Sequence, residues 1–273
     1  MAAEGVGDGQ AVRRTFQTSD GVTLSFLEAG AGHANEKAVR IAFITGWSMP
    51  ASLWQKQLLE LGRSYQTLAL DPRGQGESEV PTFGYTADRR ATDIGEFLRP
   101  FSKVLLVGWS LGAIESLQYI DRFGDERLAG LVLVDSSVGE DPAPGSGAAF
   151  LKELRKDRQK TLAEFVGAIF KTKRSPAELN VLVRGAQRMA LNDSIALLSY
   201  SFPRTHWRQI VRGFAKPLLY IVTPQFEAQA QNLQKNRPGT QIEVFRGAGH
   251  ALFVDEPERF NMRIEKLLKS LPR

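Results

Sequence analysis

Short, nearly continuous apolar segments recur along the chain, and segments with a helical pattern of apolar and polar residues separate them. Such uninterrupted runs are typical of parallel strands that are buried on both faces of a sheet. The predicted strands of this kind are 39–45, 66–71, 103–108, 128–135, 217–223 and 241–247. Two N-terminal segments, 12–18 and 22–30, instead alternate polar and apolar residues on either side of Gly21, which predicts an antiparallel hairpin.

Helical patterns lie between the predicted strands. They cover 51–62, 86–98, 111–123, 227–236 and 258–271. Regular alternation of strand and helix favours right-handed crossovers and a parallel sheet with helices on both faces. The sequence therefore predicts an α/β fold with a mostly parallel, eight-stranded sheet flanked by helices.

The stretch 136–215 interrupts this alternation. It places roughly 80 residues between two strands, where about 30 is the spacing elsewhere, and its pattern is that of several amphipathic helices. We expect it to form a helical cap inserted after the sixth strand. The core is then 12–135 together with 216–273, and 1–11 is expected to be a flexible polar tail.

Composition narrows the class of protein. With 273 residues, 42% of them hydrophobic, the chain is long enough for one large domain or a domain with an inserted lid. The absence of cysteine excludes disulfides, thiolate metal sites and a cysteine nucleophile. No apolar stretch approaches the roughly 18 residues of a membrane span, and the N-terminus has no apolar signal core. We therefore expect a cytoplasmic enzyme without a membrane span.

The net charge of +5 is concentrated in the predicted cap, where 151–215 holds thirteen Lys and Arg against five Asp and Glu. One interpretation is a solvated helical surface. The other is a docking face for an anionic partner or substrate. Basic residues do not interleave with aromatic ones, so nucleic acid is not an expected partner.

One serine lies at a tight corner of the predicted fold, in Gly108-Trp109-Ser110-Leu111-Gly112. The motif follows a strand run directly and opens a helical run directly, which is the context that a Gly-x-Ser-x-Gly nucleophile requires. Small flanking residues allow strained backbone angles at the serine, and the helix start supplies free N–H groups. The alternative is a purely structural role, in which Ser110 is a turn residue that caps a helix.

A serine nucleophile needs a base, and the chain contains three histidines. His33 lies in a polar loop and His206 in the predicted cap. His250 follows the last strand run directly, so only this histidine is expected at the carboxyl edge of the sheet together with Ser110. We predict His250 as the base.

These motifs together resemble the α/β-hydrolase superfamily over about residues 12–271. The resemblance rests on the Ser110 motif, on 71–78 (Asp-Pro-Arg-Gly-Gln-Gly-Glu-Ser), and on 247–250 (Gly-Ala-Gly-His) followed by Glu256-Pro257-Glu258. It points to the capped group with carboxylesterases, haloperoxidase-like perhydrolases and carbon–carbon bond hydrolases. It implies the α/β-hydrolase fold and a serine, acid, histidine order.

The resemblance also assigns the second Gly-Trp-Ser, at 46–48. In the superfamily the loop after the third strand donates a backbone N–H to the oxyanion, which implies Trp47 and Leu111 as the two donors. Thr45 stands where the family usually has histidine. A change of the Trp47 side chain would leave its N–H in place. The Trp47 and Trp109 rings are either walls of an acyl pocket or ordinary core aromatics.

In the superfamily a carboxylic acid completes a catalytic triad with the serine and the histidine, and in this chain that acid is not at its usual position. The superfamily usually places it after the seventh strand, where this chain has Gln225 and Phe226. The resemblance offers Asp135, after the sixth strand, as the predicted acid. Glu227 is the alternative, and a degraded or absent acid is the third possibility. Asp71 is expected to be structural.

The resulting prediction is a serine carboxylic-ester hydrolase that works through an acyl-enzyme on a small-molecule ester, without metal or organic cofactor. Alternatives are a perhydrolase or haloperoxidase-like enzyme, a carbon–carbon bond hydrolase, and a ligand receptor with the same fold. The chain also resembles carrier-protein methyl esterases, which implies an acidic carrier protein as a partner of the basic cap. Predicted pocket residues in the cap are Phe150, Leu154, Phe165, Phe170, Leu182, Met189, Leu198 and Phe202.

Overall fold

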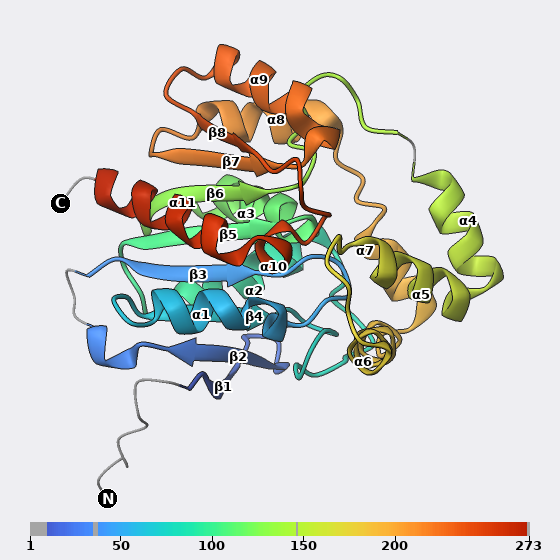
Figure 1. Ribbon diagram of the computed structural model, residues 1–273. Coiled ribbons are helices and arrows are strands. Elements are labelled where there is room, and N and C mark those ends of the chain that lie inside the picture. Colours follow the sequence, from blue (N-terminus) through green and yellow to red (C-terminus); the bar gives the residue numbers. More distant parts are fainter. Residues whose placement is uncertain (1–9, 35–37, 146, 272–273) are drawn as a thin grey trace, which may run out of the picture.

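An eight-stranded sheet runs through the part of the chain that the computed structural model describes, residues 10–34, 38–145 and 147–271 (Figure 1). Most of the predicted tail, 1–9, lies outside the described residues. The strand order is β1-β2-β4-β3-β5-β6-β7-β8, and β2 alone of these eight runs opposite to the other strands. The strands are β1 Val12–Gln17, β2 Thr23–Ala29, β3 Arg40–Ile44, β4 Thr67–Asp71, β5 Val104–Trp109, β6 Leu128–Val134, β7 Leu218–Val222 and β8 Gln241–Val244. The predicted α/β-hydrolase fold is confirmed.

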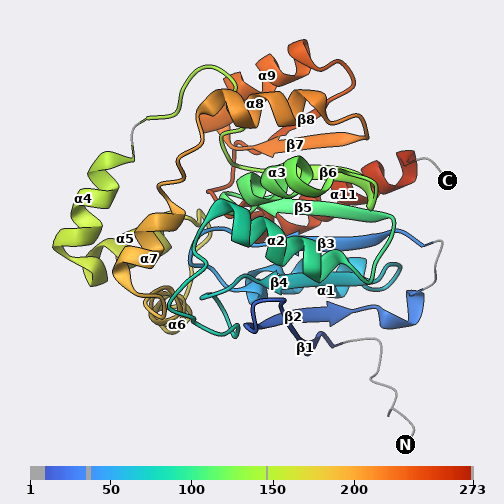
Figure 2. The same cartoon turned by 180° about the vertical axis from the view of Figure 1, so that it is seen from behind.

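Helices cover both faces of the sheet, and Figures 1 and 2 show the two faces in turn. One face carries α1, α10 and α11, and the other carries α2, α3, α8 and α9. Each layer buries its own apolar cluster against the sheet. These helices are α1 Gln55–Leu61, α2 Ala87–Leu98, α3 Leu111–Phe123, α8 Arg204–Gly213, α9 Glu227–Asn236, α10 Leu252–Asp255 and α11 Pro257–Ser270.

The apolar pattern explains these positions. Every residue of β5 is buried, as expected for a central strand with helices on both faces. Along α11, Phe260, Ile264 and Leu267 recur at helical spacing and face the sheet, while Met262 between them is exposed. The periodicity therefore determines which side of each helix is buried.

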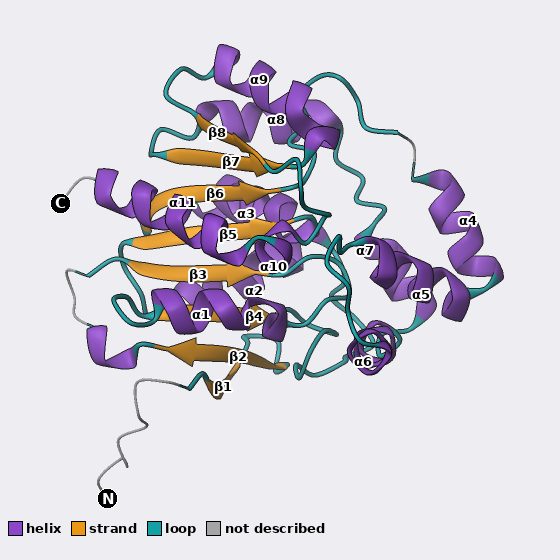
Figure 3. Cartoon of the chain, viewed as in Figure 1, coloured by secondary structure: helices purple, strands orange, loops and turns teal. Residues whose placement is uncertain are grey.

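Four further helices, here called the cap helices, lie beyond the carboxyl ends of the central strands (Figures 1 and 2). They are α4 Ala148–Lys156, α5 Arg158–Ala168, α6 Pro176–Ala186 and α7 Leu191–Leu197. A loop then leads from α7 back to α8 (Figure 3), which packs on the sheet because Trp207 and Val211 belong to the same apolar cluster as Leu117 of α3. The range 136–215 thus contains the four cap helices and one helix that packs on the sheet. The predicted domain boundaries, with a cap at 136–215 and a core at 12–135 and 216–273, stay a prediction.

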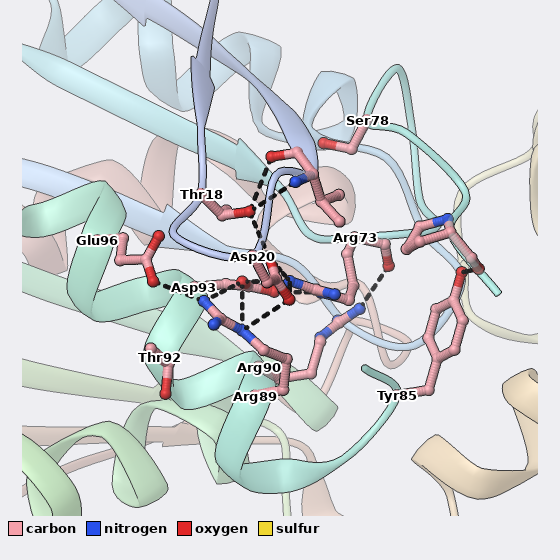
Figure 4. Close-up of polar contacts among 12 residues, drawn as sticks. Thr18, Asp20, Arg73, Ser78, Tyr85, Arg89, Arg90, Thr92, Asp93 and Glu96 are labelled. Carbon is pink, nitrogen blue, oxygen red and sulfur yellow. Dashed lines mark hydrogen bonds and ion pairs between the residues drawn. The ribbon is translucent and has the colours of Figure 1, made fainter. Parts of the chain in front are cut away.

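A buried ion network joins the β1–β2 turn, the loop after β4 and helix α2 (Figure 4). The side chain of Arg73 is fully buried, and its Nε and Nη2 donate to the two oxygens of Asp93 at 2.7 and 2.8 Å. Its Nη2 also donates to Asp20 at 3.0 Å. Burial opposes the positive charge, but Asp93 and Asp20 outweigh it and raise the pKa of Arg73. Arg73 therefore stays charged and holds three segments together.

Replacing Asp93 with Asn should lower the free energy of unfolding by about 3 kcal/mol, because breaking a buried pair leaves part of a buried charge uncompensated. Urea unfolding measures the loss. The control is Glu60→Gln, which breaks the exposed Arg63–Glu60 pair and should change the free energy by less than about 1 kcal/mol. Equal losses in the two variants would contradict this account of Arg73.

Candidate active site

Ser110 occupies a strained corner between β5 and α3. Its backbone has φ 54° and ψ −120°, which is rare for a residue with a side chain. A Cβ on Gly108 would lie 2.5 Å from the Gly112 carbonyl oxygen, and a Cβ on Gly112 would lie 2.5 Å from that of Ile44. Both glycines are therefore required by close backbone approach, and the turn presents Ser110 at the carboxyl edge of the sheet.

His250 and Asp135 meet at the same edge. The Nδ1 atom of His250 lies 2.7 Å from a carboxylate oxygen of Asp135, which is 1% exposed. The other carboxylate oxygen accepts the backbone N–H of Thr223 at 2.6 Å. Because a carboxylate only accepts, Nδ1 is the donor in this contact, and in a neutral imidazole of this tautomer Nε2 has the free lone pair.

The alternative acid has a different partner. Glu227, the first residue of α9, accepts from Arg246 at 2.6 Å. Gln225 and Phe226, which stand where the acid is usual, border the larger cavity described below. His206 is also occupied elsewhere, since its Nε2 lies 2.8 Å from Gln118. The structure thus joins His250 to Asp135 and not to Glu227.

Trp109 connects the serine corner to the histidine loop. Its indole N–H donates to the His250 carbonyl at 2.9 Å, and its ring centre lies 5.3 Å from the imidazole. Among the described residues no hydrogen bond joins the Ser110 hydroxyl to His250. Catalytic hydrogen bonds of this kind often tighten only when substrate is bound.

The loop after β3 passes directly beside Ser110, since a Cβ on Gly46 would lie 3.0 Å from that of Ser110. The side chain of the next residue, Trp47, has contacts of its own. Its indole N–H donates to the Ser194 carbonyl of α7 at 2.7 Å, and its ring packs edge-on against Phe150 and Phe165. A side-chain change at Trp47 therefore reaches the cap helices even though it leaves the backbone N–H in place.

Two cavities open at Ser110. The larger, of about 460 Å³, is bordered by Trp47, Ser110, Gly147, Phe150, Leu151, Phe165, Leu198, Gln225 and Phe226. The smaller, of about 250 Å³, is bordered by Ser110, Leu111, Ile114, Ser136, Leu197, Leu198, Tyr200 and Trp207. Apart from Ser110 itself, the larger cavity has four aromatic residues on its border and the smaller has two hydroxyl-bearing ones, Ser136 and Tyr200.

The other predicted pocket residues lie elsewhere. Phe170 and Leu182 border a separate groove with Arg174. Phe202 stacks on His206 at 4.3 Å between ring centres. The remaining ones, Trp109, Leu154 and Met189, are buried and border neither cavity at Ser110. An amphipathic pattern shows that a cap side chain is buried, but not which neighbour buries it.

Sequence reasoning missed a buried polar chain beside the site. Tyr200 donates to Glu115 at 2.9 Å, Glu115 pairs with Arg90 at 2.9 Å, and Arg90 donates to Gln75 at 3.1 Å. Burial raises the pKa of Glu115 against the opposing charge of Arg90. Burial, reinforced by Glu115, raises the pKa of Tyr200 well above its usual range, so the phenol keeps its proton. Gln75 lies within the 71–78 motif, and this motif was the one feature of the sequence that could have pointed to the polar chain.

Much of the positive charge in 151–215 is used inside the molecule. Arg158 donates to the Met189 carbonyl, Arg188 to the Ser78 carbonyl, and Arg212 pairs with Glu140 at 2.6 Å. Arg155 and Lys156 of α4 are exposed. The acidic carrier protein has no support from these contacts and stays a prediction.

The described residues contain neither a membrane-crossing helix nor a cluster of metal-binding side chains. No helix there is long and apolar enough to cross a membrane. No group of three or more His, Asp or Glu side chains within those residues could hold a metal ion.

Comparison with known proteins agrees with the fold. The profile of the alpha/beta hydrolase family matches residues 41–263. The AB hydrolase superfamily protein YisY of Bacillus subtilis is 25% identical over 280 residues, which cover 93% of this chain and 98% of that protein. A non-heme chloroperoxidase of Kitasatospora aureofaciens is 24% identical, with 92% and 98% covered. An esterase from Exiguobacterium antarcticum superposes with a TM-score of 0.79 at 19% identity, with 94% and 99% covered.

Trp47→Phe keeps an aromatic ring between Phe150 and Phe165 but removes the donor to Ser194. Trp207→Phe makes the same exchange at a buried indole whose N–H has no hydrogen bond among the described residues. We expect the first variant to lose about 1 kcal/mol more unfolding free energy than the second, the net worth of one buried hydrogen bond. Denaturant unfolding compares them, and equal losses would show that the Ser194 contact contributes nothing.

Proposed function

This chain belongs to the alpha/beta hydrolase family, and we propose that it is a serine hydrolase that cleaves carboxylic esters through an acyl-enzyme. One observation carries the proposal. The His250–Asp135 pair, joined at 2.7 Å, lies at the sheet edge where the strained Ser110 borders two cavities. A nucleophile, a base and a group that orients the base are what this chemistry needs.

In the first half-reaction, His250 Nε2 takes the proton of the Ser110 hydroxyl while Oγ attacks the ester carbonyl carbon. The carbonyl oxygen becomes an oxyanion, which the backbone N–H groups of Trp47 and Leu111 stabilise. Asp135 stabilises the imidazolium by accepting from Nδ1. The tetrahedral intermediate then collapses, the C–O bond breaks, and His250 returns the proton to the departing alcohol.

In the second half-reaction, water takes the place of the alcohol. His250 removes a proton from the water as its oxygen attacks the acyl-enzyme, and the same two N–H groups hold the new oxyanion. Collapse releases the carboxylic acid and returns the proton to Ser110. No cofactor enters either step.

The two cavities suggest where the acyl and alcohol portions of an ester bind. The larger has Trp47, Phe150, Leu151 and Phe165 on its walls, which suits an apolar acyl chain. The smaller has Ser136 and Tyr200 among its borders, which suits the more polar alcohol portion. We assign the acyl group to the larger cavity and the alcohol to the smaller.

Peroxyacid formation is a second candidate, favoured by the relative that is named a non-heme chloroperoxidase. In this reaction hydrogen peroxide, in place of water, attacks the acyl-enzyme. The O–H proton goes to His250, the bond between the acyl carbon and Ser110 Oγ breaks, His250 returns the proton to Oγ, and the product is a peroxyacid. The same serine, histidine and acid serve both reactions.

The ester reaction is tested with a chain-length series of p-nitrophenyl esters. Ser110→Ala should abolish turnover, and Asp135→Asn should lower kcat by roughly 10³–10⁴-fold because the imidazole loses the partner that fixes its tautomer. Glu227→Gln is the matched control and should keep nearly full turnover, since Glu227 pairs with Arg246. The reverse order of the two acid variants would overturn the assignment.

The peroxide reaction is tested with acetate and hydrogen peroxide at mildly acidic pH. Peroxyacetic acid should form with the wild-type enzyme and not with Ser110→Ala. Peroxyacid that forms equally in both would come from a route that does not use Ser110, and the second candidate would then be rejected.

A further inference from the structure

The peptide unit between Gly46 and Trp47 has two ends that point in opposite directions. A trans peptide is planar, so the carbonyl of Gly46 and the N–H of Trp47 are rigidly coupled. Among the described peptide bonds only Asp141–Pro142 is cis. Whatever holds the Gly46 oxygen therefore also aims the Trp47 N–H.

The buried side chain of Gln75 holds that oxygen. Its amide nitrogen donates to the Gly46 carbonyl and to the Met49 carbonyl, each at 2.9 Å. These two acceptors bracket the turn that contains Ser48, whose φ of 59° is costly for a residue with a side chain. One amide group thus supports both ends of a strained turn.

The orientation of this amide is fixed from its other side. Arg90 donates from Nη2 to the Gln75 side-chain oxygen at 3.1 Å, and since arginine has no acceptor the amide nitrogen must face the loop. Arg90 is held in turn by the Arg73 carbonyl at 2.8 Å, near the network of Figure 4, and by the fully buried Glu115. Tyr200, which donates to Glu115, also borders the smaller cavity.

We propose that Gln75 is a positioning residue that aims the Trp47 N–H at the oxyanion, with Arg90 and Glu115 fixing its amide. The inference rests on the proposed ester hydrolysis. Donation to the Gly46 oxygen also polarises the peptide, which makes the N–H at its other end a stronger donor. The buried Glu115–Arg90 pair, which is costly to desolvate, then serves the geometry of the reaction centre.

Gln75→Met keeps the side-chain volume and removes both donors. With a short p-nitrophenyl ester, kcat should fall by about 10- to 100-fold, less than the roughly 10²–10³-fold loss known for deletion of an oxyanion donor, while KM changes little. The inhibition constant of an alkyl trifluoromethyl ketone, whose adduct with serine carries an oxyanion, should rise by a similar factor. The inhibition constant of the ketone distinguishes the two explanations, because a misplaced N–H weakens binding of the oxyanion adduct, whereas a structural defect elsewhere does not.

Gln57→Met is the matched control. Gln57 is fully buried on α1, and its amide donates to the Phe253 carbonyl at 3.0 Å, a position that does not involve the loop after β3. This variant should lose stability with kcat and ketone inhibition unchanged. Equal effects of the two variants, or a Gln75→Met loss confined to KM, would overturn the positioning role.

If Gln75→Met does not fold, Gln75→Glu replaces it. This side chain has the same shape and lies beside the cationic Arg90, but its carboxylate cannot donate to Gly46. Its kcat should fall as well, and full activity would overturn the proposal. Failure of the proposed function is distinguishable, because it would appear as absent ester turnover in the wild type or as unchanged turnover in Ser110→Ala.

Discussion

The chain passes from β5 into α3 through a single residue, and the left-handed backbone of Ser110 is the constraint on which the rest of the site depends. At this corner the backbone approaches itself too closely for a Cβ at 108 or 112, and the start of α3 lies against the carbonyl end of β3. That approach places the loop after β3 beside the serine. A Cβ on Gly46 would lie 3.0 Å from that of Ser110, so the two Gly-Trp-Ser segments meet at this corner.

Loops at the edge of a sheet have few backbone partners, and here side chains supply them. The Gln75 side chain serves the loop after β3, and the Trp109 side chain holds the histidine loop. At Asp135 the carboxylate itself is the side-chain partner, and it accepts the backbone N–H of Thr223. Trp109 ends β5, Thr223 directly follows β7, and Gln75 is held by the buried Arg90–Glu115 pair. The reaction centre is therefore held by a second set of polar groups, and the proposed chemistry uses the geometry that they maintain.

Much of this was accessible from sequence because it depends on local patterns. Apolar runs located the strands, and the rule that parallel strands end at one edge put Ser110 and His250 at the same edge. Asp135 was implied by the resemblance to the α/β-hydrolase superfamily. The partners of buried polar groups were not accessible. Gln75 meets Gly46, and Glu115 meets Tyr200 across 85 positions, and no periodicity encodes such contacts. The prediction of the cavity lining was wrong in part for the same reason. Met189 is buried and Phe202 stacks on His206, so neither borders the cavities at Ser110, and only the packed fold reveals these neighbours.

The anchors of the site share one property: Trp47, Trp109 and Gln75 all donate to main-chain carbonyls, those of Ser194, His250 and Gly46. Every amino acid carries such a carbonyl. The residues that receive these contacts can therefore change identity during evolution while the contact persists. In helix α7, a change at Leu197, which borders the smaller cavity, would alter the shape of that cavity without removing the Ser194 carbonyl that receives the Trp47 N–H. Selectivity and catalytic geometry can then diverge separately within one scaffold.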